Sequence, residues 1–593
     1  MTVLSNLLLR SPLRLIWALL PLFFFAACSR SVPSDAAIEL AIHGVGGPVL
    51  KNLETALELP PELTTPPVDP YWLERFIRRI PKTSQEALAP FGYYQAQVAV
   101  NGPTPVNGRR RIDIVVTPGD PVEVGRLQLE VDPDAPTELQ ALTESFPLTP
   151  GAPLRQDLYE KAKGEWISKA VDLGYLDARF SRHTLLLDPE NNLADVDLRL
   201  ESGPRYRFGT LLIHGAPDYP ERFLRRYLTF AAGETFSYNQ LGETQRNFLD
   251  SDRFNEVLVS PQKELVRDDE VPVNIWLTPR PLFSLRPGLG YGSDTGSRLS
   301  LRYRDLNALK RGHEFSSELY VAEENQSLGL TYTLPDPLEL GSATNLRGDF
   351  NREVLDSYES RAISLEVERL KGLGRGRLGT LYVRLLQEDY HVADSSDRSQ
   401  MLIPGLRFSQ QRQRQGSGLP TGYLYTLELR GARELVHNDT SLLQGLVSAH
   451  AVRHLTGPLS LLLRLEGGTT LLNDRVSNVP ASLRFFAGGD KSVRGYAYRS
   501  LGPTDSSGEV IGGRHLLVAS SELEFSFNES WGSALFFDAG NAFDLPVDFD
   551  WKKGVGVGLR RYTVVGPIML DVARQVGERD PRYRLHLSIG FVW

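Results

Sequence analysis

The sequence predicts a multidomain protein in which three small α+β domains, each with the order β-α-α-β-β, precede a transmembrane antiparallel β-barrel of about 16 strands. Three observations support this fold class. A pattern of strands and helices recurs before residue 280, apolar and polar residues alternate without a helical period after residue 282, and an export signal opens the chain.

The composition narrows the classes of function open to the chain. Its 593 residues carry a formal net charge of −8, so the chain lacks the basic excess that drives binding to nucleic acids. The single cysteine excludes an intrachain disulfide, a cysteine-rich zinc site and an iron–sulfur cluster. Hydrophobic residues make up 41% of the chain, which is enough to exclude wholesale disorder.

Residues 1–28 have the pattern of a secretory signal peptide. Arg10 and Arg14 precede an apolar run over residues 15–27, which is too short to cross a hydrocarbon core of about 30 Å as a helix. Cys28 follows two alanines at the end of this run, an arrangement similar to a bacterial lipobox, and is therefore a candidate lipidation site. The alternative is ordinary signal cleavage, with Cys28 incidental. Both interpretations place the mature protein outside the cytoplasm.

The next part of the chain contains three copies of one unit. Each copy opens with a strand-like segment, at residues 38–44, 125–131 and 209–215. Each closes with a strand in which apolar residues alternate, at residues 112–116, 196–200 and 273–277. Helical stretches lie between them, so the spacing predicts domains at residues 37–121, 122–203 and 204–280.

The helices of the first two copies carry apolar side chains at helical spacing. We expect two stripes to pack on their sheets, one of Tyr71, Trp72, Phe76 and Ile80, the other of Leu158, Ala162, Trp166 and Ala170. The repeated order resembles the polypeptide-transport-associated (POTRA) module. That resemblance implies an exposed sheet edge to which an extended client chain can add as a further strand.

Residues 282–593 alternate as the strands of a barrel in lipid do. In residues 423–430 the tyrosines and leucines share one face, and from Arg584 to Trp593 charged or polar residues alternate with apolar ones. A soluble sandwich also alternates, but the export signal, the scarcity of helical windows and the terminal aromatic residue favour a membrane barrel. Such a sheet must close, because an open edge in hydrocarbon leaves backbone groups without partners.

A long motif at residues 484–503 links the barrel to a known family. It reads RFFAGGDKSVRGYAYRSLGP and closely resembles the RFFAGGD…RGY…P loop signature of the TamA type within the BamA/TamA superfamily of outer-membrane assembly factors. Residues 555–560 with 565–571, and residues 536–541, resemble late-strand motifs of the same family. With the three repeats in front, the resemblance extends from about residue 37 to the end of the chain.

The resemblance implies a lumenal site at the tip of this loop. Arg494 would fold back into the barrel and pair with Asp538 and Glu524, and alternation along the strand points Glu524 toward the lumen. The alternative is a solvated loop arginine. The other residues of the implied loop motif are Gly488, Gly489, Asp490, Gly495 and Tyr496.

The family resemblance also implies a lateral gate between the first and last barrel strands. Glycine inside a strand weakens pairing, and proline removes a donor from the ladder. The first strand carries three glycines after a proline, and the last carries one among strong strand formers. The residues implied at this gate are Gly288, Gly290, Gly292, Gly590 and Trp593.

The implied function is outer-membrane insertion or secretion of barrel proteins, including autotransporters. The implied partners are unfolded outer-membrane protein clients, outer-membrane lipid and a TamB-like protein anchored in the inner membrane, with the POTRA domains in the periplasm. A two-partner secretion pore that exports one client through its lumen and a structural envelope tether are the alternatives. We expect no enzyme activity, no cofactor and no metal site, because no nucleophile-elbow or nucleotide-loop context occurs.

Overall fold

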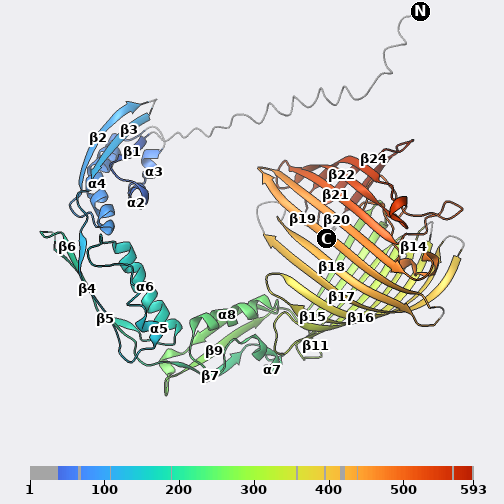
Figure 1. The fold of residues 1–593 in the computed structure, drawn as a ribbon, viewed down its shortest axis with the longest axis horizontal. Helices are drawn as coiled ribbons and strands as arrows, with labels where there is room; N and C mark the ends of the chain where they lie inside the picture. The colour runs from blue at the N-terminus through green and yellow to red at the C-terminus, as the bar shows by residue number, and fades with distance from the viewer. Residues whose placement is uncertain are drawn as a thin grey trace, which may run out of the picture. The chain divides into compact units, whose positions relative to one another are not determined.

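The computed structural model describes residues 38–64, 68–106, 109–188, 190–355, 358–392, 395–414, 421–436, 439–563 and 566–589. The predicted signal peptide with Cys28, and the predicted gate residues Gly590 and Trp593, lie outside the described residues. The chain separates into two compact units (Figure 1). The first extends to Arg207 and includes the short segments Thr235–Tyr238 and Arg267–Glu270, and the second contains the remainder. We describe each unit by itself.

The first sheet has the strand order β1-β3-β2 and carries its helices between β1 and β2. Strand β1 runs parallel to its neighbour β3, whereas β2 runs antiparallel to β3. The elements are β1 (Ile38–His43), α2 (Gly47–Ala56), α3 (Pro61–Thr64), α4 (Pro70–Leu88), η1 (Ala89–Phe91), β2 (Gln97–Val106) and β3 (Arg109–Thr117).

The second and third sheets repeat this order as β4-β6-β5 and β7-β9-β8. The second consists of β4 (Glu123–Val131), α5 (Thr137–Gln140), α6 (Gln156–Asp172), β5 (Arg179–Asp188) and β6 (Leu193–Glu201). The third consists of β7 (Arg207–His214), α7 (Glu221–Leu224), η2 (Arg225–Tyr227), α8 (Tyr238–Asp250), β8 (Phe254–Pro261), η3 (Lys263–Leu265) and β9 (Glu270–Pro279). The predicted order β-α-α-β-β is therefore confirmed for all three sheets. No helix among the described residues is long and apolar enough to cross a bilayer.

The core of the second sheet lies between α6 and the inward face of β6. Ala162, Trp166 and Ala170 are buried as predicted, and Leu158 packs against them while partly exposed. Along β6, every second side chain from Ala194 to Leu200 is buried, as expected for a strand with one covered face.

The predicted stripe on α4 is wrong at its N-terminal end. Tyr71 is 66% exposed and Trp72 is 37% exposed, whereas Leu73 and Ile80 are buried in the core. At about 100° per residue, Tyr71 lies roughly 200° from Leu73 around the helix, so the two side chains point in nearly opposite directions. Phe76 packs at the margin of the core.

The second half of the chain forms a closed barrel of 16 antiparallel strands in which sequential strands are neighbours, as predicted (Figure 1). The strands are β10 (Phe283–Gly292), β11 (Gly296–Ala308), β12 (His313–Ala322), β13 (Asn325–Pro335), β14 (Ala343–Val354), β15 (Tyr358–Gly372), β16 (Arg377–Val392), β17 (Ser395–Arg414), β18 (Thr421–Glu434), β19 (Ser441–Thr456), β20 (Leu459–Leu472), β21 (His515–Ser526), β22 (Trp531–Phe543), β23 (Lys552–Arg561), β24 (Ile568–Val576) and β25 (Tyr583–Ile589).

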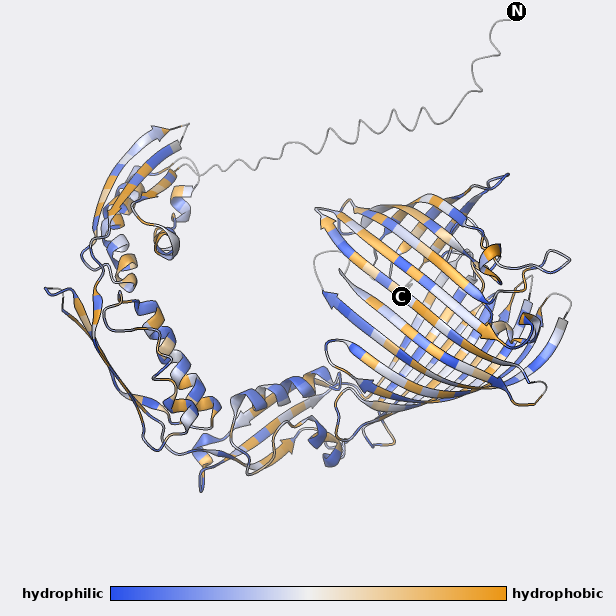
Figure 2. Cartoon of the chain, viewed as in Figure 1, coloured by the Kyte–Doolittle hydropathy of each residue, from blue (hydrophilic) through white to orange (hydrophobic). Residues whose placement is uncertain are grey.

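The barrel wall has an apolar outer face and a polar lumen, and the alternation is visible along the strands in Figure 2. On β16, Leu381, Val383 and Leu385 are exposed, while Thr380 and Glu388 are buried inside. An exposed apolar belt of this kind is stable where lipid covers it, so the wall has the chemistry of a membrane-spanning barrel.

Polar contacts within the second unit hold the third sheet domain against one end of the barrel. The Asp252 carboxylate accepts hydrogen bonds from Arg280 and, at 3.1 Å, from Arg304 of β11. The side-chain amide of Asn307 donates to the Asp218 carbonyl at 2.8 Å. The domain is therefore anchored beside the beginning of the first barrel strand.

Replacing Trp166 with alanine should unfold the second sheet domain locally, because truncating a buried tryptophan costs about 3–5 kcal/mol. The matched control is Trp72→Ala, in which a partly exposed indole outside the core is removed at a cost of about 1 kcal/mol or less. Limited proteolysis of the full-length protein should show faster cleavage within residues 122–203 for Trp166→Ala alone. Equal cleavage of the two variants would contradict the placement of these side chains.

Candidate functional site in the barrel lumen

The segment between β20 and β21 folds into the barrel, and its centre is Arg494. This arginine is only 5% exposed, although it belongs to a connection between strands rather than to the wall. Gly488, Gly489 and Gly495 have φ angles of +101°, +105° and +99°, which other residues rarely adopt. A Cβ at Gly488 would lie 2.4 Å from the Ala497 carbonyl oxygen, so the path of the loop requires glycine there.

Arg494 is held by three carboxylates from three strands. Its Nε and Nη2 donate to the two oxygens of Asp538 on β22, at 2.7 and 3.0 Å, in a bidentate pair. Its Nη1 donates to Glu522 on β21 at 2.7 Å and to Asp571 on β24 at 3.1 Å. The guanidinium carbon lies 3.4 Å from the centre of the Phe536 ring, so the ion is also packed against an aromatic face.

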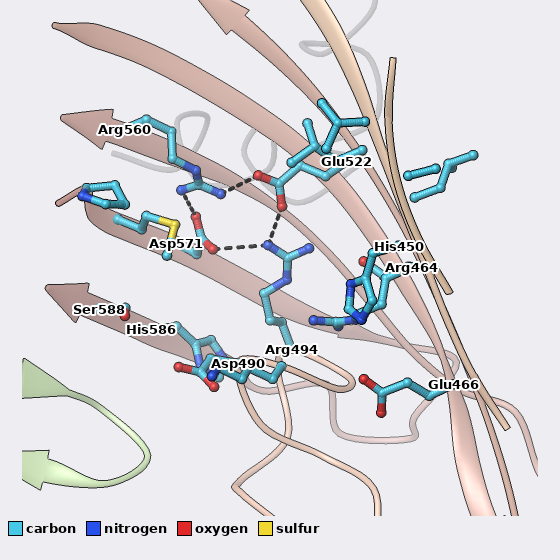
Figure 3. A pocket seen from close by; sticks show the side chains of 18 residues that line it. His450, Arg464, Glu466, Asp490, Arg494, Glu522, Arg560, Asp571, His586 and Ser588 are labelled. Carbon is cyan, nitrogen blue, oxygen red and sulfur yellow. Dashed lines mark hydrogen bonds and ion pairs between the residues drawn. The ribbon is translucent and has the colours of Figure 1, made fainter. Parts of the chain in front are cut away.

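A second arginine completes the network shown in Figure 3. Arg560 on β23 donates to Glu522 at 2.6 Å and also to Asp571, so two guanidinium groups share these two carboxylates. With Asp538, the cluster contains two positive and three negative groups. Because each strand from β21 to β24 contributes a member, the network joins four neighbouring strands and fixes the loop to them.

The structure corrects one predicted partner of Arg494. The pairing with Asp538 is confirmed, but Glu524 makes no contact with the arginine, and its Oε1 has no hydrogen-bond partner among the described residues. Glu522 occupies that role instead. Asp538 opposes Ser520, so Glu522 is its diagonal neighbour, while Glu524 lies one period farther along the same lumenal face. Alternation predicts on which face of the sheet a side chain lies, but the register between strands decides which side chains on that face meet.

The loop also contacts both strands that close the barrel. The Asp490 backbone N–H donates to Asp294, a carboxylate in the turn between β10 and β11 that is 3% exposed, at 2.6 Å. The Gly495 N–H donates to His586 of β25 at 3.1 Å. The Tyr496 hydroxyl donates to Glu578 at 2.9 Å, so the tripeptide Arg494-Gly495-Tyr496 is held to the last hairpin.

Sequence reasoning missed several members of the site. The sequence assigns no role to Asp294, Glu522 or His586, and includes Arg560 and Asp571 only in a late-strand motif. Gly554 on β23 also belongs to the site, because a Cβ there would lie 1.9 Å from the Arg494 carbonyl oxygen. The sequence pattern that could identify these residues is the recurrence of charged residues at lumen-facing positions of consecutive strands.

Strands β10 and β25 meet where the barrel closes. Among the described residues, only Tyr291 with Ile589 and Gly292 with Ser588 pair across this junction, whereas β10 and β11 share ten such pairs. One further backbone bond runs from the Ser293 N–H to the Leu587 carbonyl at 2.9 Å. Of the predicted gate residues, Gly292 pairs with Ser588 on β25, while Gly288 and Gly290 pair with Ser300 and Arg298 on β11.

A cavity of about 230 Å³ lies beside the network in the lumen (Figure 3). Its wall includes His450, Arg464 and Glu466 together with members of the cluster. Within the described part of the chain, no group of three His, Cys, Asp or Glu side chains is arranged to hold a metal ion. The site therefore offers charge pairing and space for polar groups.

Comparison with known proteins identifies the family of the barrel. Residues 307–593 match the Omp85 superfamily domain, and residues 39–118 match the POTRA domain described as TamA domain 1. The barrel belongs to the Omp85 superfamily. The first sheet domain is accordingly a POTRA domain, and the other two sheets share its strand order.

The chain is also similar to one assembly factor in sequence and to solved structures. The chain is 23% identical over 445 residues to the outer membrane protein assembly factor BamA of Nitratidesulfovibrio vulgaris, and spans 55% of that protein and 70% of its own length. Among solved structures, BamA from Haemophilus ducreyi lacking POTRA domains 1–3 has the same fold, with a TM-score of 0.63 and 17% identity over 79% of this chain and 99% of that one. CdiB from Acinetobacter baumannii has a TM-score of 0.47 and 13% identity over 79% and 90% of the two chains.

Glu522→Gln should destabilise the barrel, because it leaves two buried arginines short of a carboxylate, at a cost of about 3–5 kcal/mol. Glu524→Gln is the matched control on the same strand and face, and should be neutral or stabilising because it removes an unpaired buried charge. Urea titration of the folded fraction in lipid vesicles measures both. Equal destabilisation by the two substitutions would contradict the assigned pairing.

Proposed function

We propose that the protein is an outer-membrane insertase of the TamA type, which helps to assemble or secrete β-barrel proteins and autotransporters through a lateral gate between β10 and β25. The observation that carries the proposal is that the first and last strands close the barrel, with Tyr291 of β10 paired to Ile589 and Gly292 to Ser588 of β25. The kinship with BamA, whose name describes an outer membrane protein assembly factor, supports the same class of activity.

The gate works through the chemistry of an unpaired strand edge. When β10 and β25 separate, the backbone groups along their edges lose their partners, and each unsatisfied group in hydrocarbon costs several kcal/mol. An incoming strand that adds to this edge satisfies these groups by β-augmentation. Burial of its apolar face in lipid supplies further free energy, so the reaction requires no nucleotide and no catalytic residue.

The Arg494 network serves this mechanism by holding the wall next to the gate. It joins β21 to β24 from the inside, while its loop contacts the Asp294 turn and His586 on the two sides of the junction. The four strands before the gate thus stay together when the last strand separates from the first.

The proposal includes the surroundings of the protein. The barrel would lie in the outer membrane with its three sheet domains in the periplasm, where unfolded outer-membrane protein and autotransporter clients arrive. The partner would be a TamB-like protein anchored in the inner membrane. The TamA-type POTRA domain at residues 39–118 supports this branch of the family.

Depletion of the protein, followed by a mass-spectrometric census of the outer membrane, tests the proposed function. Several barrel proteins or autotransporters should decrease together. Loss of one secreted client with an unchanged barrel population would favour the two-partner secretion pore. An unchanged outer membrane and secretome would leave only a structural tether and would overturn the proposal.

A disulfide across the gate should stop assembly. Cysteines at Tyr291 and Ile589, which pair across the junction, would be introduced with Cys28 replaced by serine. Oxidation should block client assembly, and reduction should restore it, because the strands must separate. The control is a disulfide between Tyr320 and Ser327, which pair on β12 and β13. Full activity of the oxidised gate variant would refute lateral opening.

Arg494→Ala should impair client assembly while the barrel remains in the membrane. Removing one member of a buried charge cluster costs about 2–5 kcal/mol, but the ladder of the outer wall is untouched. Assembly kinetics of a model client in cells measure the loss, and immunoblotting of membrane fractions verifies the level of the variant. Normal assembly at normal protein level would contradict the role of the network.

A further inference from the structure

The three glycines of β10 lie on its lumenal face. Their neighbours Leu289 and Tyr291 point outward, and Leu289 is 80% exposed. Gly290 stands directly opposite Arg298 on β11. With no side chain at Gly290, the lumenal surface of β10 is open at this position, and the long arginine side chain can extend across it.

Arg298 uses this opening to reach the last strand. Its Nη2 donates to the carbonyl oxygen of Ile589 at 2.7 Å, and so connects β11 with β25 over the top of β10. A Cβ at Gly290 would lie 2.5 Å from Arg298 Nε and 2.7 Å from the Ile589 oxygen. Even alanine at Gly290 is therefore incompatible with this contact.

Arg298 differs from the lumenal arginines next to it on the same strand. Arg302 pairs with Glu318 at 2.7 Å and Arg304 pairs with Glu314 at 2.6 Å, both across β11 and β12. No ion pair between described residues includes Arg298. The residue opposite Arg298 on β12 is Ala322, which has no charge. The guanidinium of Arg298 is thus directed to the junction rather than to a neighbouring carboxylate.

We propose that Arg298 is a latch of the junction, a positioning residue that holds the end of β25 against β10 through the gap left by Gly290. The inference deepens the proposed function, since it names the contact that must break before the gate opens. The latch is one hydrogen bond from a charged donor to a backbone carbonyl, worth about 1.5–3 kcal/mol. It therefore reinforces the junction and still releases when β25 moves.

The latch also requires glycine, and no larger residue, at position 290. A glycine that merely weakened the strand could be exchanged for alanine with little effect on β25. On the latch account, Gly290→Ala has the same consequence as loss of the arginine, because the new methyl group occupies the path of the guanidinium. The two substitutions change different strands and should give one phenotype.

Hydrogen–deuterium exchange of the full-length protein in lipid nanodiscs tests the latch. Arg298→Met removes the donor and keeps the length of the side chain. Amides in Tyr583–Ile589 should exchange about tenfold faster in this variant, as expected for loss of one hydrogen bond to a charged donor. Gly290→Ala should accelerate the same amides, and Arg298→Lys should retain part of the protection.

The matched control is Arg302→Met, which removes the next lumenal arginine of β11. It should leave the exchange of Tyr583–Ile589 unchanged. Unchanged exchange in both Arg298→Met and Gly290→Ala would overturn the latch, as would equal acceleration in Arg302→Met. The exchange measurement contains no client, so its failure leaves the proposed insertase function standing, and failure of the depletion experiment leaves the latch standing.

Discussion

The structure depends on the ion cluster around Arg494. A loop that fills a barrel lumen has to be held there, and this loop is held by a guanidinium whose three carboxylate partners come from β21, β22 and β24. Buried charges are tolerated only when they are paired, so each member makes the others necessary. The glycine path of the loop, Gly554 in the wall and Arg560 all follow from placing that one side chain in the lumen.

The same arrangement reconciles two opposing requirements on the wall. A sheet in hydrocarbon must close, yet a barrel that accepts new strands must open at one place. Here contacts from the lumen supplement the ladder that closes the barrel between β10 and β25: the Asp490 N–H donates to Asp294, the Gly495 N–H to His586 and Arg298 to the Ile589 carbonyl. One partner in each of these hydrogen bonds is a side chain. Such a bond can therefore break while the backbone ladders between the other barrel strands stay intact.

The sequence was sufficient to predict the fold class, because the period of the apolar residues indicates the buried faces of strands and helices, and internal repeats indicate the domains. It predicted the β-α-α-β-β order and a closed barrel of about 16 strands, and the family resemblance implied the Arg494–Asp538 pair. It failed where the register between strands determines which side chains meet, so that Glu524 was predicted in place of Glu522. It also failed where the rotation of a helix determines which side chains are buried, as for Tyr71 on α4. Arg298 was invisible for the same reason, since its contact with Ile589 joins strands nearly 300 residues apart in sequence.

A double-mutant cycle between Arg494 and Asp538 tests the central claim most directly. The free energy of unfolding of the barrel in lipid vesicles would be measured for the wild type, Arg494→Met, Asp538→Asn and the double variant. If the cluster holds the loop in the lumen, the double variant should be more stable than the sum of the single effects predicts, by about 1.5 kcal/mol or more. Effects that add within about 0.5 kcal/mol would show that the two side chains act independently and would contradict the account.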